Sequence, residues 1–206
     1  MDYEWAYAGS LGMVKAKKMT TANESHIKNL LVAIGEDPDR EGLKDTPRRV
    51  VKSWETLFGG YKQNPKEVLK TQFTTNHKSM VVCDNIEFYS TCEHHLLPFY
   101  GFCHIGYIPN KKIIGLSKMP RLLETFARRL QIQERLTDQI ADSLMEHLDP
   151  LGCGVIIKSK HLCMVCRGIQ KRNASMITSS IRGIFFQSHV KDEFTQLINL
   201  KSKDTQ

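Results

Sequence analysis

Two short segments that lie far apart in the sequence carry thiols and imidazoles, the side chains that bind transition metals. The first reads Cys-Glu-His-His at residues 92–95, and the second reads His-Leu-Cys at residues 161–163. A hydrolytic zinc site needs three protein ligands, an open position for water and a nearby acid or base. Cys92, His95 and Cys163 could supply the three ligands. We therefore predict a metal centre that folding assembles from the two segments.

The spacing of the cysteines also allows a closed structural site. Cys163 and Cys166 have the Cys-x-x-Cys spacing, and a site that combined them with Cys92 and His95 would be an inert Cys3His site. Spacing alone favours the open and the closed site equally. A third interpretation, in which the histidines are ordinary core residues, is less favoured because the histidines are clustered.

Two histidines remain free if the site is open. His94 points away from the metal when its neighbour His95 binds it, and His161 would share the face of Cys163 if residues 161–163 form a strand. An imidazole beside a metal-bound water can transfer protons near neutral pH. Either histidine could instead orient a metal ligand.

A second group of residues suits an anion such as phosphate. Ser117, Lys118 and Arg121 lie at the predicted start of a helix, where backbone N–H groups and positive charge favour a phosphate. Arg167 could add a cation from another segment. Glu134 lies in the first turn of a further predicted helix, where the helix dipole favours an acid. It could also read guanine, because a carboxylate accepts two parallel N–H bonds.

The pattern of apolar residues predicts an α+β domain with mainly antiparallel strands and helices on one face of the sheet. Helices are expected over residues 24–34, from 45 to 59, after Ser117, over 133–148 and over 192–200. Strands are expected over residues 80–83, 86–91, 102–108, 113–114, 154–160, 164–171 and 175–185, with a turn at 84–85. We expect a disordered tail at residues 1–22, a helical extension at 23–62 and a catalytic domain at 63–206.

Composition restricts the class of protein. The 206 residues carry a net charge of +7 that is spread along the chain, and this argues against a nucleic-acid partner. No apolar run is long enough to span a membrane, and the N-terminus does not look like a secretory signal. Six cysteines are too few for a disulfide scaffold. We therefore expect a cytoplasmic protein without a nucleic-acid or membrane partner.

Several longer motifs resemble the GTP cyclohydrolase I family, in order across roughly residues 24–200. They read Thr-Cys-Glu-His-His at 91–95, Cys-His-Ile-Gly-Tyr-Ile-Pro at 103–109, Gly-Leu-Ser-Lys at 115–118, Gln-Ile-Gln-Glu-Arg-Leu-Thr at 131–137, His-Leu-Cys-Met at 161–164 and Arg-Gly at 167–168. Gly-Glu-Asp-Pro-Asp at 35–39 and Asp-Thr-Pro at 45–47 also match.

The resemblance implies a zinc-dependent hydrolase that converts GTP to 7,8-dihydroneopterin triphosphate and formate, the first step of tetrahydrofolate or tetrahydrobiopterin synthesis. It implies the open site, with zinc on Cys92, His95 and Cys163 and proton transfer by His94 and His161. The substrate contacts that it implies are Glu134 for guanine, Gln133, Ser117, Lys118, Arg121, Arg167, Leu116 and Ile132. It also implies a T-fold (tunnelling fold) subunit in a homodecamer of two pentamers, with active sites at subunit interfaces.

Two other hypotheses predict different behaviour. A T-fold relative could act on another purine or pterin. A structural zinc module could instead bind RNA through its basic surface, and it would show a closed four-ligand site and salt-sensitive binding.

Overall fold

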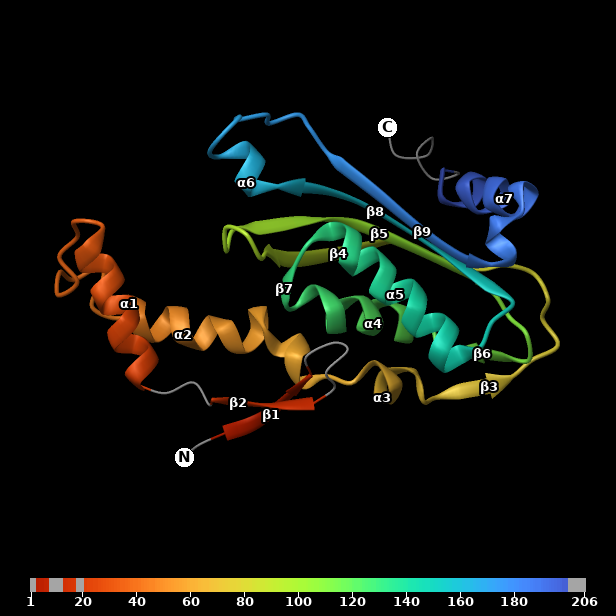
Figure 1. Cartoon of the computed structure of the whole chain (residues 1–206), viewed down its shortest axis with the longest axis horizontal. Coiled ribbons are helices and arrows are strands. Elements are labelled where there is room, and N and C mark those ends of the chain that lie inside the picture. Colours follow the sequence, from red (N-terminus) through yellow and green to blue (C-terminus); the bar gives the residue numbers. More distant parts are fainter. Residues whose placement is uncertain (1–2, 8–12, 18–20, 200–206) are drawn as a thin grey trace. The chain divides into compact units, whose positions relative to one another are not determined.

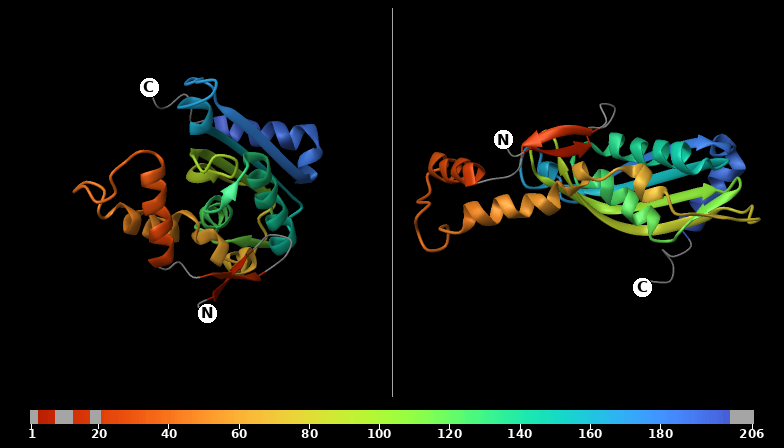
Figure 2. Two further views of the ribbon diagram at one scale, coloured as in Figure 1. Left: turned by 60° about the vertical axis from the view of Figure 1, so that its left-hand side comes forward. Right: turned by 90° about the horizontal axis from the view of Figure 1, so that it is seen from below.

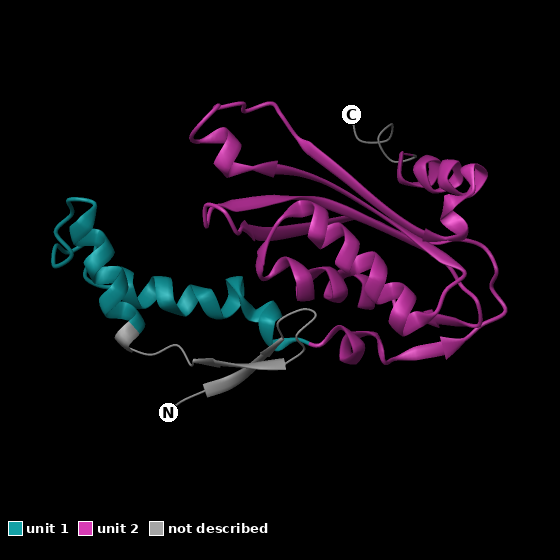
Figure 3. Ribbon diagram, viewed as in Figure 1, with its two compact units in different colours: residues 1–63 teal, residues 64–206 magenta. Residues whose placement is uncertain are grey.

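The computed structural model describes residues 3–7, 13–17 and 21–199 (Figure 1). The chain divides into two compact units, residues 1–63 and 64–206 (Figure 3). The predicted boundary between the helical extension and the catalytic domain lies beside this division.

The first unit contains a pair of strands and two α-helices. Its elements are β1 (Tyr3–Tyr7), β2 (Met13–Lys17), α1 (Thr21–Ala33), α2 (Thr46–Leu57) and the 3-10 helix η2 (Gly59–Lys62). β1 and β2 pair antiparallel, and the sequence analysis did not predict them. Apart from these strands and the start of α1, the expected disordered tail at residues 1–22 lies outside the described residues. Pro47 lies in the first turn of α2, where the missing N–H costs no helical hydrogen bond.

The second unit is built on a five-stranded sheet. Its strands are β3 (Gln72–Thr74), β4 (Val81–Cys92), β5 (Pro98–Ile108), β6 (Lys112–Ile114), β7 (Leu130–Gln131), β8 (Gly152–His161) and β9 (Met176–Gly183). Its helices are α3 (Pro65–Leu69), α4 (Lys118–Ala127), α5 (Gln133–Leu148), α6 (Leu162–Val165), η3 (Ile184–Phe186) and α7 (Ser188–Asn199). The sheet order is β7-β4-β5-β8-β9, and neighbours pair antiparallel except β4 and β7, which are parallel. β3 and β6 form a separate antiparallel pair.

One face of the sheet carries the main hydrophobic core. α4 and α5 lie along this face (Figure 2). Alternate residues of β5 point into the core, as a strand requires, and those from Cys103 to Tyr107 are fully buried. Leu136, Ile140 and Leu144 follow one another at a spacing of four, so they form the stripe by which α5 packs on the sheet.

The opposite face is partly covered as well, so the prediction that all helices lie on one face is wrong. η3 and α7 place Phe185 and Phe194 against this face, in a second core cluster. A Cβ at Gly106 would lie 2.7 Å from the Phe194 ring, and a Cβ at Gly154 would lie 2.7 Å from the Phe185 ring. Glycine at these two positions therefore allows the helix to approach the sheet.

Two local predictions were also wrong. The expected turn at residues 84–85 is a β-bulge inside the continuous strand β4, with Asn85 in the left-handed region at φ 52°. The expected strand at residues 164–171 is absent, since β8 ends at His161, α6 follows directly and a loop continues to β9. Within that loop, Gly168 and Gln170 have positive φ angles, which no extended strand permits.

Among the helices that the structure describes, none combines the length and the apolar character needed to cross a membrane.

Candidate active site

The three predicted metal ligands come together in the folded chain. Cys92 ends β4, His95 lies in the turn that follows, and Cys163 lies in α6. Their ligand atoms all lie within 4.8 Å of one another. The turn is closed by the Leu96 backbone N–H, which donates to the Cys92 carbonyl oxygen at 2.9 Å. The continuous strand and this tight turn thus aim Cys92 and His95 at one point, which Cys163 approaches from the second segment.

The spacing of the ligand atoms suits a tetrahedral ion. Cys92 Sγ and His95 Nδ1 are 3.6 Å apart. Zinc bonds of about 2.3 Å to sulfur and about 2.0–2.1 Å to nitrogen, at a tetrahedral angle, would separate the two atoms by about 3.6 Å. Burial, and next the neighbouring thiol of Cys92, raises the pKa of the Cys163 thiol. The Cys163 thiol therefore stays protonated unless a nearby cation stabilises its thiolate, and the donor set fits a bound metal.

Cys166 is not part of this group. Its side chain is exposed, and its thiol donates to the Leu162 carbonyl oxygen at 3.0 Å. In the described part of the chain the cluster therefore has three candidate ligands, Cys92, His95 and Cys163, and the folded chain does not gather a Cys3His set.

An ion pair holds the first ligand segment against α5. Arg135 donates through Nη2 to the Glu93 carboxylate and to the Leu130 carbonyl oxygen, and through Nε to Gln131 Oε1. The hydrogen bond from Arg135 keeps the pKa of Glu93 below its ordinary value. The Glu93 backbone N–H also donates to the Gln131 carbonyl oxygen at 3.0 Å, beside the parallel pairing of β4 with β7. The turn that carries His95 is thus tied to the start of α5 at several points.

His161 is more enclosed than the other candidate for proton transfer. Its ring stacks on Phe99, with centroids 4.5 Å apart and an angle of 3° between the planes, and its Nε2 lies 2.9 Å from Gln133 Oε1. Burial lowers the pKa of His161. His94 is 64% exposed and lies 3.8 Å from Glu93 Oε1, too far for a hydrogen bond.

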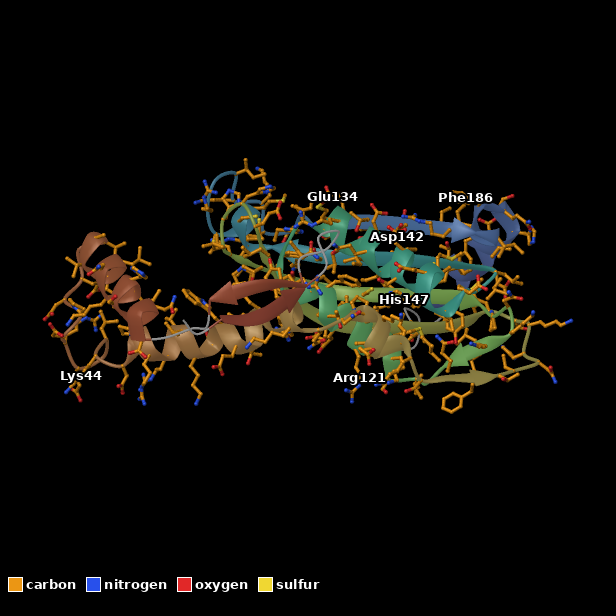
Figure 4. All side chains as sticks on the ribbon, turned by 60° about the horizontal axis from the view of Figure 1, so that its bottom comes forward. Lys44, Arg121, Glu134, Asp142, His147 and Phe186 are labelled. Atoms are coloured by element: carbon orange, nitrogen blue, oxygen red, sulfur yellow. The ribbon has the colours of Figure 1, made fainter. Side chains whose placement is uncertain are left out.

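Gln133 is buried, and its side chain is turned into the protein. Its amide nitrogen donates to the backbone oxygens of Ile157 and Met176 and to Thr178 Oγ1, at 3.0, 3.2 and 3.1 Å. Its oxygen faces His161. A substrate contact by this side chain, which the sequence analysis expected, would have to break these bonds. The next residue, Glu134, is exposed at the start of α5 and has the freedom to meet a ligand (Figure 4).

Three of the predicted phosphate contacts, Ser117, Lys118 and Arg121, lie at the other end of α4, whereas the fourth, Arg167, acts electrostatically on Cys163 beside the metal group. Lys118 opens this helix, while its last residue, Ala127, leads into β7, which pairs with Cys92. Ten residues of α-helix span about 15 Å, so the metal group and the start of α4 are about one helix length apart. Figure 4 shows Arg121 on α4 and Glu134 on α5 extending from opposite edges of the unit. The remaining predicted contacts are the exposed residues Ser117, Leu116 and Arg167 and the half-buried Ile132.

Comparison with known proteins identifies the family. The sequence model of the GTP cyclohydrolase I family matches residues 23–199. The chain belongs to the GTP cyclohydrolase I family. The GTP cyclohydrolase 1 of Campylobacter jejuni subsp. doylei is 55% identical over 178 residues, which cover 85% of this chain and 94% of that protein. The GTP cyclohydrolase 1 of Leptospira biflexa is 54% identical over 181 residues, which cover 87% of this chain and 99% of that protein.

One solved structure is similar to a part of this GTP cyclohydrolase I family member. The archaeosine synthase QueF-like protein in its apo form superposes with a TM-score of 0.41 and 15% identity, over 51% of this chain and 94% of that one. This likeness is too weak to establish a common fold.

Sequence reasoning missed the residues that hold the site in place. Arg135 belongs to the family motif at residues 131–137, but the motif itself did not show that this side chain reaches Glu93. Phe99 lies in a strand that was expected to begin at residue 102, so its stacking on His161 was not predicted. The sequence signal that could have indicated them is the recurrence of polar residues at 131, 133 and 135, where α5 begins.

Proposed function

We propose that this GTP cyclohydrolase I converts GTP to 7,8-dihydroneopterin triphosphate and formate at a zinc ion held by Cys92, His95 and Cys163. The observation that carries the proposal is the convergence of these three ligand atoms within 4.8 Å of one another. The reaction is the first step of pterin synthesis, toward tetrahydrofolate or tetrahydrobiopterin.

The donor set is of the kind that leaves one position of a tetrahedral ion open. When bound, zinc would lower the pKa of water toward neutrality and so supply the nucleophile for C8 of the purine. His161 then protonates N7 of the purine as the imidazole ring opens to a formamide. A second water hydrolyses this formamide, so that formate leaves and the amine remains. His94, exposed beside the ligand segment, serves as the second proton carrier. The ribose chain rearranges and closes onto the resulting diamine.

The exposed carboxylate of Glu134 is proposed to select guanine. It can accept two hydrogen bonds, one from N1–H and one from the exocyclic amine of guanine. Adenine does not offer this pair of donors, so it would leave the carboxylate unpaired in a closed site and would bind poorly. Ile132 and the backbone around Gln133 would line the same pocket, and a second copy of the chain would add its Leu116.

A second copy of the chain is proposed to complete the active site. The triphosphate suits the side chains of Ser117, Lys118, Arg121 and Arg167. The start of α4, however, lies about one helix length from the metal group. In the described part of the chain β9 pairs with β8 alone, so this edge of the sheet offers free backbone groups to another strand. Both features support active sites at subunit interfaces, and the proposed assembly is a T-fold subunit in a homodecamer of two pentamers, with α1 and α2 as an N-terminal extension.

The cytoplasm is the proposed location. Neither Cys92 nor Cys163 forms a disulfide, and both must remain reduced to bind zinc. A reducing compartment preserves this state.

A turnover assay with matched cysteine variants tests the proposal. Zinc-loaded protein is given GTP, and formate and the fluorescent pterin formed after oxidation are both measured. We expect equal amounts of the two products from the wild type and from Cys166→Ala, and neither product nor stoichiometric zinc from Cys163→Ala. Formate without pterin would restrict the function to ring opening. If the zinc-bound wild type forms neither product and Cys166→Ala loses zinc, the site is a closed structural one and the protein is not this enzyme.

A further inference from the structure

The orientation of the Gln133 amide is determined by its surroundings. Two of the groups around it, the backbone oxygens of Ile157 and Met176, can only accept hydrogen bonds, so the NH2 group must face them. The amide oxygen therefore faces the other way, toward Ser159 Oγ at 2.5 Å and His161 Nε2 at 2.9 Å. Gln133 is 1% exposed, so water does not compete for these bonds.

This orientation decides which nitrogen of His161 carries the proton. An amide oxygen can only accept, so the imidazole nitrogen that faces it must be a donor. In a neutral imidazole one nitrogen is protonated and the other is not. Nε2 therefore carries the hydrogen, and Nδ1 is the unprotonated nitrogen. A half-turn of the ring about its Cβ–Cγ bond would place a carbon at the amide oxygen and lose the hydrogen bond.

We infer that Gln133 is a positioning residue for proton transfer, which holds His161 in the Nε2–H tautomer so that Nδ1 exchanges the proton with the substrate. The inference rests on the proposed function of His161 and adds to it the reacting atom and the residue that selects it. Phe99 fixes the plane of the ring by stacking, and Gln133 fixes which of the two flipped orientations the ring adopts in that plane.

The proton balance of the step follows from this tautomer. The imidazolium form of His161 carries hydrogens on both nitrogens. As the purine ring opens, the Nδ1–H bond breaks, a hydrogen forms a bond to N7 of the purine, and the electron pair stays on Nδ1. The neutral ring that results is the tautomer that Gln133 binds. Gln133 itself takes no proton, because its amide oxygen remains a hydrogen-bond acceptor throughout.

The test compares two substitutions around the same oxygen. Gln133→Met removes the amide with little change in side-chain length, and Ser159→Ala removes the other donor to that oxygen but leaves the contact with His161 intact. For Gln133→Met we expect a loss in kcat of about 10²- to 10⁴-fold, the range of a general acid, with KM and zinc content close to those of the wild type. For Ser159→Ala we expect a loss of less than about threefold. Equal kcat values for the two variants would overturn the inference.

A double-mutant cycle separates positioning from a structural effect. If Gln133 acts through His161, Gln133→Met should cause no further loss of formate release in a His161→Ala background. Losses that multiply would assign Gln133 a separate function and overturn the inference. If the wild type releases no formate at all, the proposed function fails first, and this outcome is distinct from either result of the cycle.

A spectroscopic measurement on the wild type does not depend on the folding of a Gln133 variant. In solid-state NMR of zinc-loaded protein with ¹⁵N-labelled histidine, the His161 signal is identified by its absence in His161→Ala. We expect a neutral ring with a protonated Nε2 and an unprotonated Nδ1. A ring protonated at Nδ1 instead would show that Gln133 does not select the tautomer.

Discussion

The ion pair between Arg135 and Glu93, which we call the clamp, should couple the start of α5 to metal binding. We predict that Arg135→Met weakens zinc binding although Arg135 is not a ligand. The substitution keeps the aliphatic part of the side chain and removes three hydrogen bonds, to Glu93, to Gln131 Oε1 at 2.9 Å and to the Leu130 oxygen at 3.1 Å. The turn that carries His95 would then be held mainly by its own backbone bonds.

The structure sets the size of the effect. The Arg135 and Glu93 side chains are 40% and 31% exposed, so solvent screening limits the ion pair to about 1 kcal/mol. Each of the other two hydrogen bonds contributes about 1 kcal/mol. A total of about 2–3 kcal/mol corresponds to a fall in melting temperature of about 5–10 °C for a chain of this length. Loss of a residue that orients metal ligands lowers metal affinity by about 10- to 100-fold.

Arg182 provides the matched control. It donates to Asp142 Oδ1 at 2.8 Å and to Asp138 Oδ1 at 3.1 Å, so Arg182→Met also removes an arginine that bridges α5 and the sheet. Melting curves of the apo proteins should show a similar loss for both variants, while competition with a chromophoric chelator should show weaker zinc binding in Arg135→Met alone. If the two variants bind zinc equally well, the clamp stabilises the fold without positioning the ligands, and the reasoning is refuted.

Three further predictions concern single positions. Gly101→Ala should sharply reduce the yield of folded protein, because a Cβ there would lie 2.0 Å from the Lys158 backbone oxygen; a normal melting curve would contradict this. Glu93→Gln should make the stability of the fold less sensitive to acid. The hydrogen bond from Arg135 lowers the pKa of Glu93, so the ionised carboxylate stabilises the fold fully above the ordinary pKa of 4.5, and this stabilisation is lost as the pH falls through the lowered pKa. Acid melting curves that coincide with those of the wild type would argue against this prediction. His161→Ala should keep zinc and lose about 10²- to 10⁴-fold in formate release; full activity would remove His161 from the scheme.

The ligand group could be predicted from the sequence because its chemistry is carried by residue type. Thiols and imidazoles in two clusters leave few alternatives to a metal, and Cys92, His95 and Cys163 do lie together. The choice between an open and a closed site could not be made from spacing. It depended on residues 162–165 forming a helical turn, after which the thiol of Cys166 bonds to the Leu162 backbone rather than joining the group.

The regular elements followed from periodicity, and the irregular ones did not. α5 occupies the predicted residues 133–148, because its apolar stripe is long and regular. The bulge at Asn85 was taken for a turn, since both need a residue with positive φ and the sequence does not show whether the flanking strands continue in line. α7 was predicted, but its face of the sheet depended on glycines at 106 and 154, whose effect appears only when β5 and β8 are neighbours.

The first turn of α5 connects the two halves of the candidate active site. Arg135 holds Glu93 in the first ligand segment, and Gln133 holds His161 at the edge of the second. Gln133 is buried and Arg135 is half-buried against Glu93, whereas Glu134 between them is exposed. In the proposed scheme, a motif that reads as a substrate-binding sequence thus contains one residue free to meet the substrate and two that position the chemistry. Because both segments are tied to the same helical turn, a shift of α5 against the sheet would move the proposed metal ligands and the proposed proton donor together.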